Sequence, residues 1–143
     1  MLEINRAKEE IGSKNVHIYT ACTEGKNRSV VAAQLLKMQF PKLENRIEVL
    51  PDGLNGLQKF LGFELQKIIA PNAELHELNG SAKKISYKKF MRKAENSILL
   101  LVISDDERRC FSEVISFLEE IGFEVAFLEA HGVEDVFKGI INS

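Results

Sequence analysis

Apolar residues along the chain fall into short continuous runs, separated by longer segments in which they recur every three or four positions. The short runs span residues 16–21, 46–50, 97–103 and 123–128, and the third of them reads SILLLVI. Continuous apolar runs of this length are typical of parallel strands that are covered on both faces. The pattern therefore predicts an α/β protein with a four-stranded parallel sheet.

Helices are expected in the segments between these runs. Residues 30–40 place Val31, Leu35 and Met38 on one stripe, which predicts an amphipathic helix that Pro41 ends. Four more segments have helical composition or spacing, and they span residues 2–11, 54–70, 86–94 and 110–121. Right-handed crossovers place such helices on both faces of a parallel sheet. We therefore predict a single-domain three-layer sandwich over residues 1–143, with residues 1–14 as an N-terminal helical extension.

Two local signals refine this outline. Ser104 and Glu107 have the spacing of a capping box, which predicts a helix N-terminus directly after the third strand. Gly56 and Gly62 interrupt the segment 54–70, where glycine weakens a helix. Residues 71–85 show no clear periodicity.

Composition and charge limit the class of protein. The chain has 143 residues, of which 45% are apolar and 28% charged, as in one folded domain. A formal net charge of −2 gives no general attraction to nucleic acid or an anionic membrane, so neither is expected as a partner. The chain shows neither a basic-then-apolar leader nor an apolar run approaching the roughly 18 residues of a membrane span. A cytoplasmic location is therefore expected.

A polar loop joins the first strand to the helix that follows it. It has the form C-x-x-G-x-x-R-S and consists of Cys22, Thr23, Glu24, Gly25, Lys26, Asn27, Arg28 and Ser29. A loop at a helix N-terminus directs backbone N–H groups inward and adds the positive end of the helix dipole, which favours an anion. Arg28 can add two parallel N–H donors for phosphate oxygens. Residues 23–28 are therefore predicted to bind phosphate.

Cys22 is the candidate nucleophile of this loop. The dipoles that bind phosphate also favour a thiolate, and Ser29 can donate a hydrogen bond to the sulfur anion. An ordinary thiol with a pKa of about 8.5 is only a few per cent ionised at pH 7, and lowering that pKa by about three units ionises it almost completely. The predicted reaction is hydrolysis of a phosphomonoester through a phosphocysteine, with the loop stabilising the equatorial oxygens.

The strand VHIYTA, the loop CTEGKNRS and the helix SVVAAQLLK resemble the start of the low-molecular-weight protein tyrosine phosphatase superfamily. Residues 86–109 are similar to the third-strand region of that family, and residues 134–139 (EDVFKG) resemble its E-D-P-Y-Y-G stretch. The resemblance implies a cysteine-dependent phosphatase that uses no metal or other cofactor. By the same match Asp135 takes the general-acid position and Phe137 that of an aromatic residue beside the pocket mouth.

The sequence departs from the family at several positions. Gly25 stands one place later than the glycine of the usual C-x-G-N-x-C-R-S loop, and the Asn-Arg-Ser ending is closer to phosphatases of the RNA polymerase C-terminal domain. Val136 stands where the family has proline. The N-terminal helix is expected to cover the face that the family closes with a C-terminal helix, a hypothesis that stability after deletion of residues 1–12 would contradict.

Several residues have alternative interpretations. Asp105 and Asp106 compete with Asp135 for the role of acid, and helix capping is the other explanation for that pair. His131 is either a loop residue or a proton donor to the leaving group. Lys26 either attracts acidic substrates or pairs with Glu24. Cys110 is expected in the core of its helix, and a thiol close to Cys22 would instead indicate an arsenate reductase.

The expected substrate is a phosphorylated protein or a small phosphomonoester. The main alternative is a non-catalytic module that binds phosphate or phosphoproteins, and a phosphocarrier is a third possibility that Arg28 disfavours. The basic run 83–93 (KKISYKKFMRK) is either a solvated helix face or a docking surface for the substrate. The sequence leaves the oligomeric state open.

Overall fold

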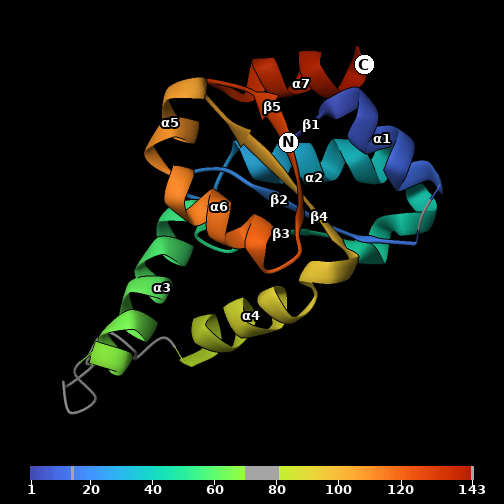
Figure 1. Ribbon diagram of the computed structural model, residues 1–143. Helices are drawn as coiled ribbons and strands as arrows, with labels where there is room; N and C mark the ends of the chain where they lie inside the picture. Colours follow the sequence, from blue (N-terminus) through green and yellow to red (C-terminus); the bar gives the residue numbers. More distant parts are fainter. Residues whose placement is uncertain (14, 70–80, 143) are drawn as a thin grey trace.

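The computed structural model describes residues 1–13, 15–69 and 81–142, with the side chains of 63–69 and 81–86 excepted. A parallel sheet of five strands forms its centre, in the order β1-β5-β4-β2-β3 (Figure 1). The strands are β1 (Leu2–Glu3), β2 (His17–Ala21), β3 (Ile47–Val49), β4 (Ser97–Ile103) and β5 (Glu124–Glu129).

Helices cover both faces of this sheet. One face carries α1 (Ile4–Ser13), α2 (Arg28–Gln39) and α7 (Val133–Ile141). The opposite side carries α3 (Gly53–Ile69), α4 (Ser81–Arg92), α5 (Asp105–Cys110) and α6 (Ser112–Glu120). Short 3-10 helices, η1 (Pro41–Arg46) and η3 (Ala94–Asn96), lead into β3 and β4. The predicted α/β architecture, a parallel sheet between two helical layers, is confirmed.

The sheet has one strand more than predicted. Leu2 and Glu3 do not begin the N-terminal helix but pair in parallel with Ala126 and Phe127 of β5. The outer edge of β5 would otherwise present unpaired backbone groups, and a two-residue strand is enough to cover part of it. The helix that follows runs from Ile4 to Ser13 and so ends two residues beyond the predicted bound at residue 11.

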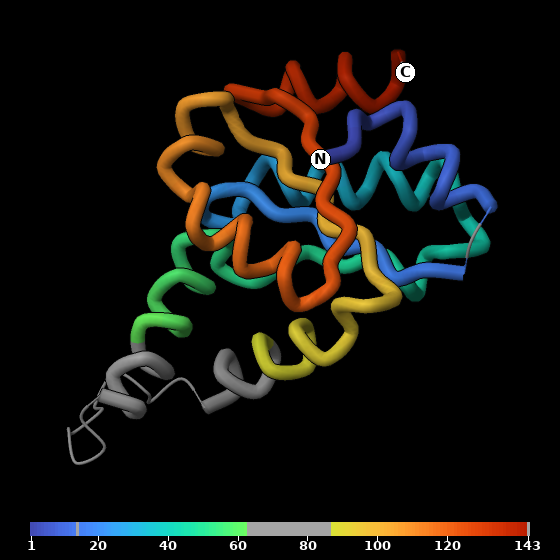
Figure 2. The backbone as a smooth tube through the Cα atoms, in the orientation of Figure 1, coloured from blue at the N-terminus to red at the C-terminus, as the bar shows by residue number. Residues whose placement is uncertain are grey.

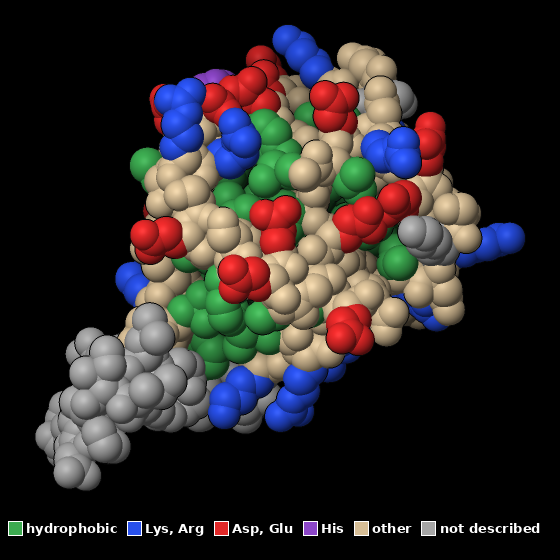
Figure 3. All heavy atoms as spheres, in the orientation of Figure 1, with side chains coloured by type: hydrophobic (Ala, Val, Ile, Leu, Met, Phe, Trp, Pro, Cys, Tyr) green, Lys and Arg blue, Asp and Glu red, His purple; other side chains and the backbone are tan. Residues whose placement is uncertain are grey.

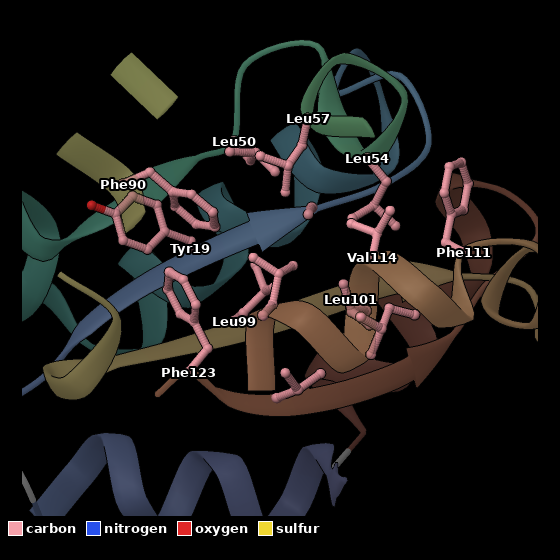
Figure 4. Packing of buried hydrophobic residues seen from close by; sticks show 14 of the residues in the cluster. Tyr19, Leu50, Leu54, Leu57, Phe90, Leu99, Leu101, Phe111, Val114 and Phe123 are labelled. Atoms are coloured by element: carbon pink, nitrogen blue, oxygen red, sulfur yellow. The ribbon is translucent and has the colours of Figure 1, made fainter. Parts of the chain in front are cut away.

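The strand β4 is the centre of the core. All seven of its residues are buried, and successive side chains point alternately into the two helical layers. Figure 4 shows Leu99 and Leu101 on the side that faces Leu54 of α3 and Val114 of α6. On the other face the core is built from α1, α2 and α7, with Ile11 among its largest buried side chains. The continuous apolar run in the sequence is thus explained by burial on both faces.

The helix α3 is continuous through Gly56 and Gly62, against the expected interruption. A Cβ atom on Gly56 would lie 2.1 Å from the Tyr87 hydroxyl oxygen, so the missing side chain allows α4 to approach α3. The Tyr87 hydroxyl donates to the Pro51 carbonyl at 2.8 Å. Residue 70, the last of the predicted helix, lies outside the described residues. Gly56 therefore serves helix packing rather than helix termination.

The predicted helix over residues 110–121 is replaced by two helices that meet at Phe111. Cys110 ends α5 and is exposed, whereas Phe111 turns inward and is 7% exposed. The expectation that Cys110 lies in the core is therefore wrong, because the chain changes direction one residue later and Phe111 takes the buried position. The predicted capping box is confirmed, since Ser104 and Glu107 bond each other's backbone N–H groups.

The helix α4 begins at Ser81, earlier than predicted, and is amphipathic. Tyr87 and Phe90 are buried, whereas Lys88, Lys89 and Arg92 are exposed. Figure 3 shows basic side chains along the lower edge of the molecule, where α4 lies in Figure 1. This arrangement favours the interpretation of the basic run as a solvated helix face. Within the described ranges, the structure contains no helix long and apolar enough to cross a membrane.

The N-terminal helix packs as part of the layer formed by α2 and α7. Figure 2 shows α1 beside the C-terminal end of α7, where the Lys8 ammonium group donates to the Ile140 carbonyl.

We expect Ile11→Ala to lower the free energy of unfolding by about 2–4 kcal/mol, because it leaves a cavity among buried side chains. Urea denaturation measures the change. Met38→Ala, at a side chain that is 76% exposed, should alter stability by less than about 0.5 kcal/mol. Equal stability of the two variants would contradict this packing.

Candidate active site

The loop 22–27 lies at the carboxyl edge of the sheet, between the end of β2 and the first turn of α2. The strand β2 has β3 on one side and β4 on the other, so the chain leaves β2 toward one neighbour and later crosses to the second. Open α/β sheets bind their ligands beyond the carboxyl ends of the strands, at the point where the strand order reverses in this way. The topology therefore places the polar loop at the expected position of a ligand site.

The first turn of α3 forms hydrogen bonds with the backbone of the loop 22–27. The backbone N–H groups of Leu54 and Asn55 donate to the carbonyls of Cys22 and Thr23 at 2.9 and 3.0 Å. These N–H groups belong to the helix start, which has no intrahelical partners for them. The loop carbonyls are therefore bound to α3. Gly25 adopts a positive φ of 72°, the left-handed conformation that glycine enters without strain.

Cys22 is 3% exposed and lies at the base of the loop. Its Sγ atom is 3.2 Å from the Ser29 hydroxyl oxygen and accepts the Gly25 backbone N–H at 3.3 Å. The Thr20 hydroxyl donates to the Ser29 carbonyl at 2.7 Å and so fixes the start of α2 to β2. These contacts hold the cysteine, the glycine and the serine of the predicted motif together.

The surroundings of Cys22 stabilise its thiolate form. Burial acts to raise the pKa of the Cys22 thiol, but hydrogen bonds from Ser29 and Gly25 and the positive charge of Arg28 act more strongly in the opposite direction. The resulting pKa lies below the ordinary value of a cysteine. A thiolate is the reactive form of cysteine, so the site favours nucleophilic chemistry at this sulfur.

Arg28 forms a bidentate ion pair with Glu107, the third residue of α5. The Nη1 atom of Arg28 lies 2.6 Å from Oε1 of Glu107, and Nη2 lies 2.9 Å from Oε2. Nη1 also donates to the Ala130 carbonyl at 2.9 Å. The hydrogen bonds from Arg28 hold the pKa of the Glu107 carboxyl far below its ordinary value, and those from Thr23 and Ser104 act in the same direction. Glu107 is therefore an anion at any pH near neutrality.

A cavity of about 240 Å³ opens above Cys22, large enough for a phosphate group. The described residues that line it are Cys22, Thr23, Glu24, Lys26, Asn27, Arg28 and Glu107. Six of these seven belong to the loop that the sequence singled out, and Gly25 and Ser29 contact the sulfur beneath. At the rim, the Lys26 ammonium and Glu24 carboxylate groups are 3.9 Å apart and both side chains are exposed, a geometry that fits the pairing alternative.

The structure does not bring Asp135 into this cavity. Asp135 lies in the first turn of α7, and its carboxylate accepts the His131 backbone N–H at 2.8 Å. That hydrogen bond lowers the pKa of Asp135 below its ordinary value. His131 and Phe137 are exposed and are also absent from the described lining. The segment nonetheless reaches the site, because the Ala130 carbonyl accepts from Arg28.

Asp105 and Asp106 are the first two residues of α5, directly after its N-cap Ser104. Both lie in the first turn of α5, where the helix dipole favours negative charge. The Asp105 carboxylate accepts hydrogen bonds from Arg108 and Arg109, and the Asp106 side chain is 87% exposed. Neither Asp105 nor Asp106 is among the described residues that line the cavity. Their geometry supports the capping interpretation over the role of general acid.

Glu107 is the site residue that the sequence did not reveal as such. The sequence indicates only that Glu107 completes a capping box with Ser104. The structure contains that box, since Oε1 of Glu107 accepts the Ser104 backbone N–H at 2.9 Å. Its position just beyond the end of β4 gave a usable signal. Because β4 and β2 are neighbouring parallel strands, acidic residues after one and a basic residue after the other meet at the same edge.

Comparisons with models of protein families, with curated proteins and with solved structures find no match for this chain. The fold and the site define an α/β protein with a cysteine and an arginine at the carboxyl edge of a parallel sheet. Within the described residues, no group of three His, Cys, Asp or Glu side chains is placed to hold a metal ion.

Proposed function

We propose that this protein is a cysteine-dependent phosphomonoester hydrolase of the protein tyrosine phosphatase type, acting on a phosphorylated protein or a small phosphomonoester. The observation that carries the proposal is the setting of Cys22. Its sulfur has a lowered pKa and lies at the base of a cavity lined by its own loop, with the Arg28 guanidinium in the wall. A stabilised thiolate beneath a cavity that can hold an oxyanion is the arrangement that covalent phosphoryl transfer requires.

The reaction proceeds in two displacements at phosphorus. In the first, the Cys22 thiolate attacks, a sulfur–phosphorus bond forms and the ester oxygen–phosphorus bond breaks, with the leaving oxygen taking a proton. In the second, water attacks, the sulfur–phosphorus bond breaks, and inorganic phosphate and the thiolate are released. The backbone N–H groups of the loop and Arg28 balance the charge on the equatorial oxygens in both steps.

The proton for the leaving group is assigned to Asp135 by the family resemblance. An acid at that step matters most for alkyl esters, because an alkoxide is a far poorer leaving group than a phenolate. Glu107 is unsuited to the task, since Arg28 holds it ionised. Asp135 would have to exchange its bond with the His131 N–H for a bond to the substrate.

A non-catalytic oxyanion-binding module is the second candidate, and a specific observation favours it. The described lining of the cavity does not include Asp135, whose carboxylate is engaged at the start of α7. A phosphate cradle in which Cys22 does not attack and no group protonates the leaving oxygen binds phosphorylated partners without turning them over. The two candidates differ in turnover, not in binding.

Hydrolysis of an aryl phosphate at pH 5–7 without metal separates the two. We expect the wild type to hydrolyse p-nitrophenyl phosphate and, after rapid acid quench, to carry a phosphoryl group on the Cys22 peptide by mass spectrometry. Asp135→Asn should slow alkyl phosphates by about 10²-fold or more and p-nitrophenyl phosphate much less. A rate unaffected by this change for both substrates would remove Asp135 as the acid. An inert wild type that phosphate still stabilises thermally would establish the binding module instead.

A further inference from the structure

Some N–H donors of the Arg28 guanidinium group have no hydrogen-bond partner among the described residues. Of its five N–H donors, three have partners among the described residues: two at Nη1, bonded to Glu107 and Ala130, and one at Nη2, bonded to Glu107. The remaining two are the Nε–H and the second Nη2–H. These two lie on one edge of the planar group and point in the same direction, which is the spacing that two phosphate oxygens accept.

The Glu107 carboxylate, which bonds the other edge of the guanidinium group, accepts further hydrogen bonds that fix its position. Thr23 donates its hydroxyl to Oε2 of Glu107, and the Ser104 backbone N–H donates to Oε1 at 2.9 Å. The backbone N–H of Glu107 in turn bonds the Ser104 hydroxyl at 3.2 Å. Glu107 therefore joins α5, Thr23 of the loop 22–27 and Arg28 in one hydrogen-bonded unit. Only 16% of the Arg28 side chain and 28% of the Glu107 side chain are exposed.

We propose that Glu107 is the positioning residue of this site, holding Arg28 so that its Nε/Nη2 edge is presented to the bound oxyanion. The inference rests on the oxyanion-binding half of the proposed function and does not require turnover. Without the carboxylate, the Ala130 carbonyl would be the remaining described partner of the long Arg28 side chain. The oxyanion would then have to complete its ordering, and the lost rotamer freedom would be subtracted from the binding free energy.

A purely electrostatic role for Glu107 predicts the opposite effect. A carboxylate in the wall of an anion site repels the oxyanion and the Cys22 thiolate, so its neutralisation should tighten phosphate binding and lower the pKa of Cys22. Loss of positioning should weaken phosphate binding and raise that pKa, because Arg28 no longer stands beside the sulfur. The sign of the change therefore distinguishes the two roles.

The test is Glu107→Gln, measured with inorganic phosphate by isothermal titration calorimetry at pH 7. Glutamine also serves as the third residue of a capping box, so this change removes the charge and keeps the helix cap. We expect the affinity for phosphate to fall about tenfold or more. Glu113→Gln, the same change at an exposed residue of α6, is the matched control and should bind within about twofold of the wild type.

A double-mutant cycle with Arg28→Lys shows whether Glu107 acts through the arginine. In the lysine background there is no guanidinium edge to position, so Glu107→Gln should not weaken phosphate binding further. In parallel, the pH dependence of Cys22 alkylation by iodoacetamide, in a Cys110→Ser background, should show a higher midpoint for Glu107→Gln.

The outcomes separate this inference from the proposed function. Wild type that binds phosphate, with Glu107→Gln binding equally well or more tightly, would overturn the positioning role and leave the hydrolase proposal standing. Equal weakening by Glu107→Gln in the arginine and lysine backgrounds would also overturn it, because the effect would not pass through Arg28. Wild type that fails to bind phosphate at all would overturn the inference together with the proposed function.

Discussion

Cys22→Ser is expected to abolish phosphomonoester hydrolysis while leaving oxyanion binding in place. A serine hydroxyl fits the same space, but its pKa lies far above that of a thiol, so serine is a much weaker nucleophile at neutral pH than Cys22, whose pKa is lowered. The turnover number for p-nitrophenyl phosphate should fall on the order of 10⁴-fold or more. The loop N–H groups and Arg28 are unchanged by the substitution, and phosphate should still raise the melting temperature.

The matched control is Cys110→Ser, which alters the other cysteine at the exposed end of α5. This variant should retain wild-type turnover. The pH dependence of alkylation adds a second check, because the lowered pKa of Cys22 predicts that its reaction with iodoacetamide persists to a lower pH than that of an ordinary cysteine. Substantial turnover by Cys22→Ser would exclude the phosphocysteine mechanism.

Gly53→Ala should both disrupt the loop 22–27 and destabilise the fold. Gly53 has a φ of 61°, and a Cβ atom there would lie 2.2 Å from the Cys22 carbonyl oxygen and 2.7 Å from that of Thr23. Both contacts are with backbone atoms, which cannot move aside as a flexible side chain can. We expect a loss of about 3 kcal/mol in the free energy of unfolding, from positive-φ strain and displacement of the loop.

The same variant should lose measurable phosphate binding, because α3 can no longer hold the loop carbonyls. Gly62→Ala on the same helix is the control, since a Cβ atom there meets nothing within 4 Å. It should raise stability by about 0.5–1 kcal/mol through the higher helix propensity of alanine. Urea denaturation and phosphate titration measure both effects. A Gly53→Ala protein as stable as Gly62→Ala, with phosphate affinity intact, would contradict the described contact between α3 and the loop.

Local patterns predicted most of the regular structure. The four predicted strands occur within one or two residues of their expected bounds, because each is an apolar run whose burial is needed for the core to form. The capping box at Ser104 could be predicted from the sequence, because its hydrogen bonds connect residues three apart along the chain. The loop from Cys22 to Ser29 could be singled out for a similar reason, since its candidate phosphate donors and candidate nucleophile follow one another along the chain.

Features that depend on distant partners were missed. The strand β1 has only two residues and exists because β5 offers it an edge. The continuity of α3 through Gly56 follows from Tyr87, thirty-one residues later, which occupies the space of the missing side chain. The break at Phe111 reflects the direction in which α6 must lie to cover the sheet. In each case a tertiary contact outweighed a local propensity.

The sequence by itself determined the α/β class and singled out the loop 22–29, because hydrophobic periodicity and a contiguous motif are local properties. The tertiary structure alone decided what surrounds that loop. It brought Glu107 from 79 positions away onto Arg28, and it placed the carboxylate of Asp135 against the His131 N–H. Side chains so far apart in sequence meet only because parallel strands bring their carboxyl ends to one edge, and no local pattern encodes which of several acidic residues there will contact the arginine.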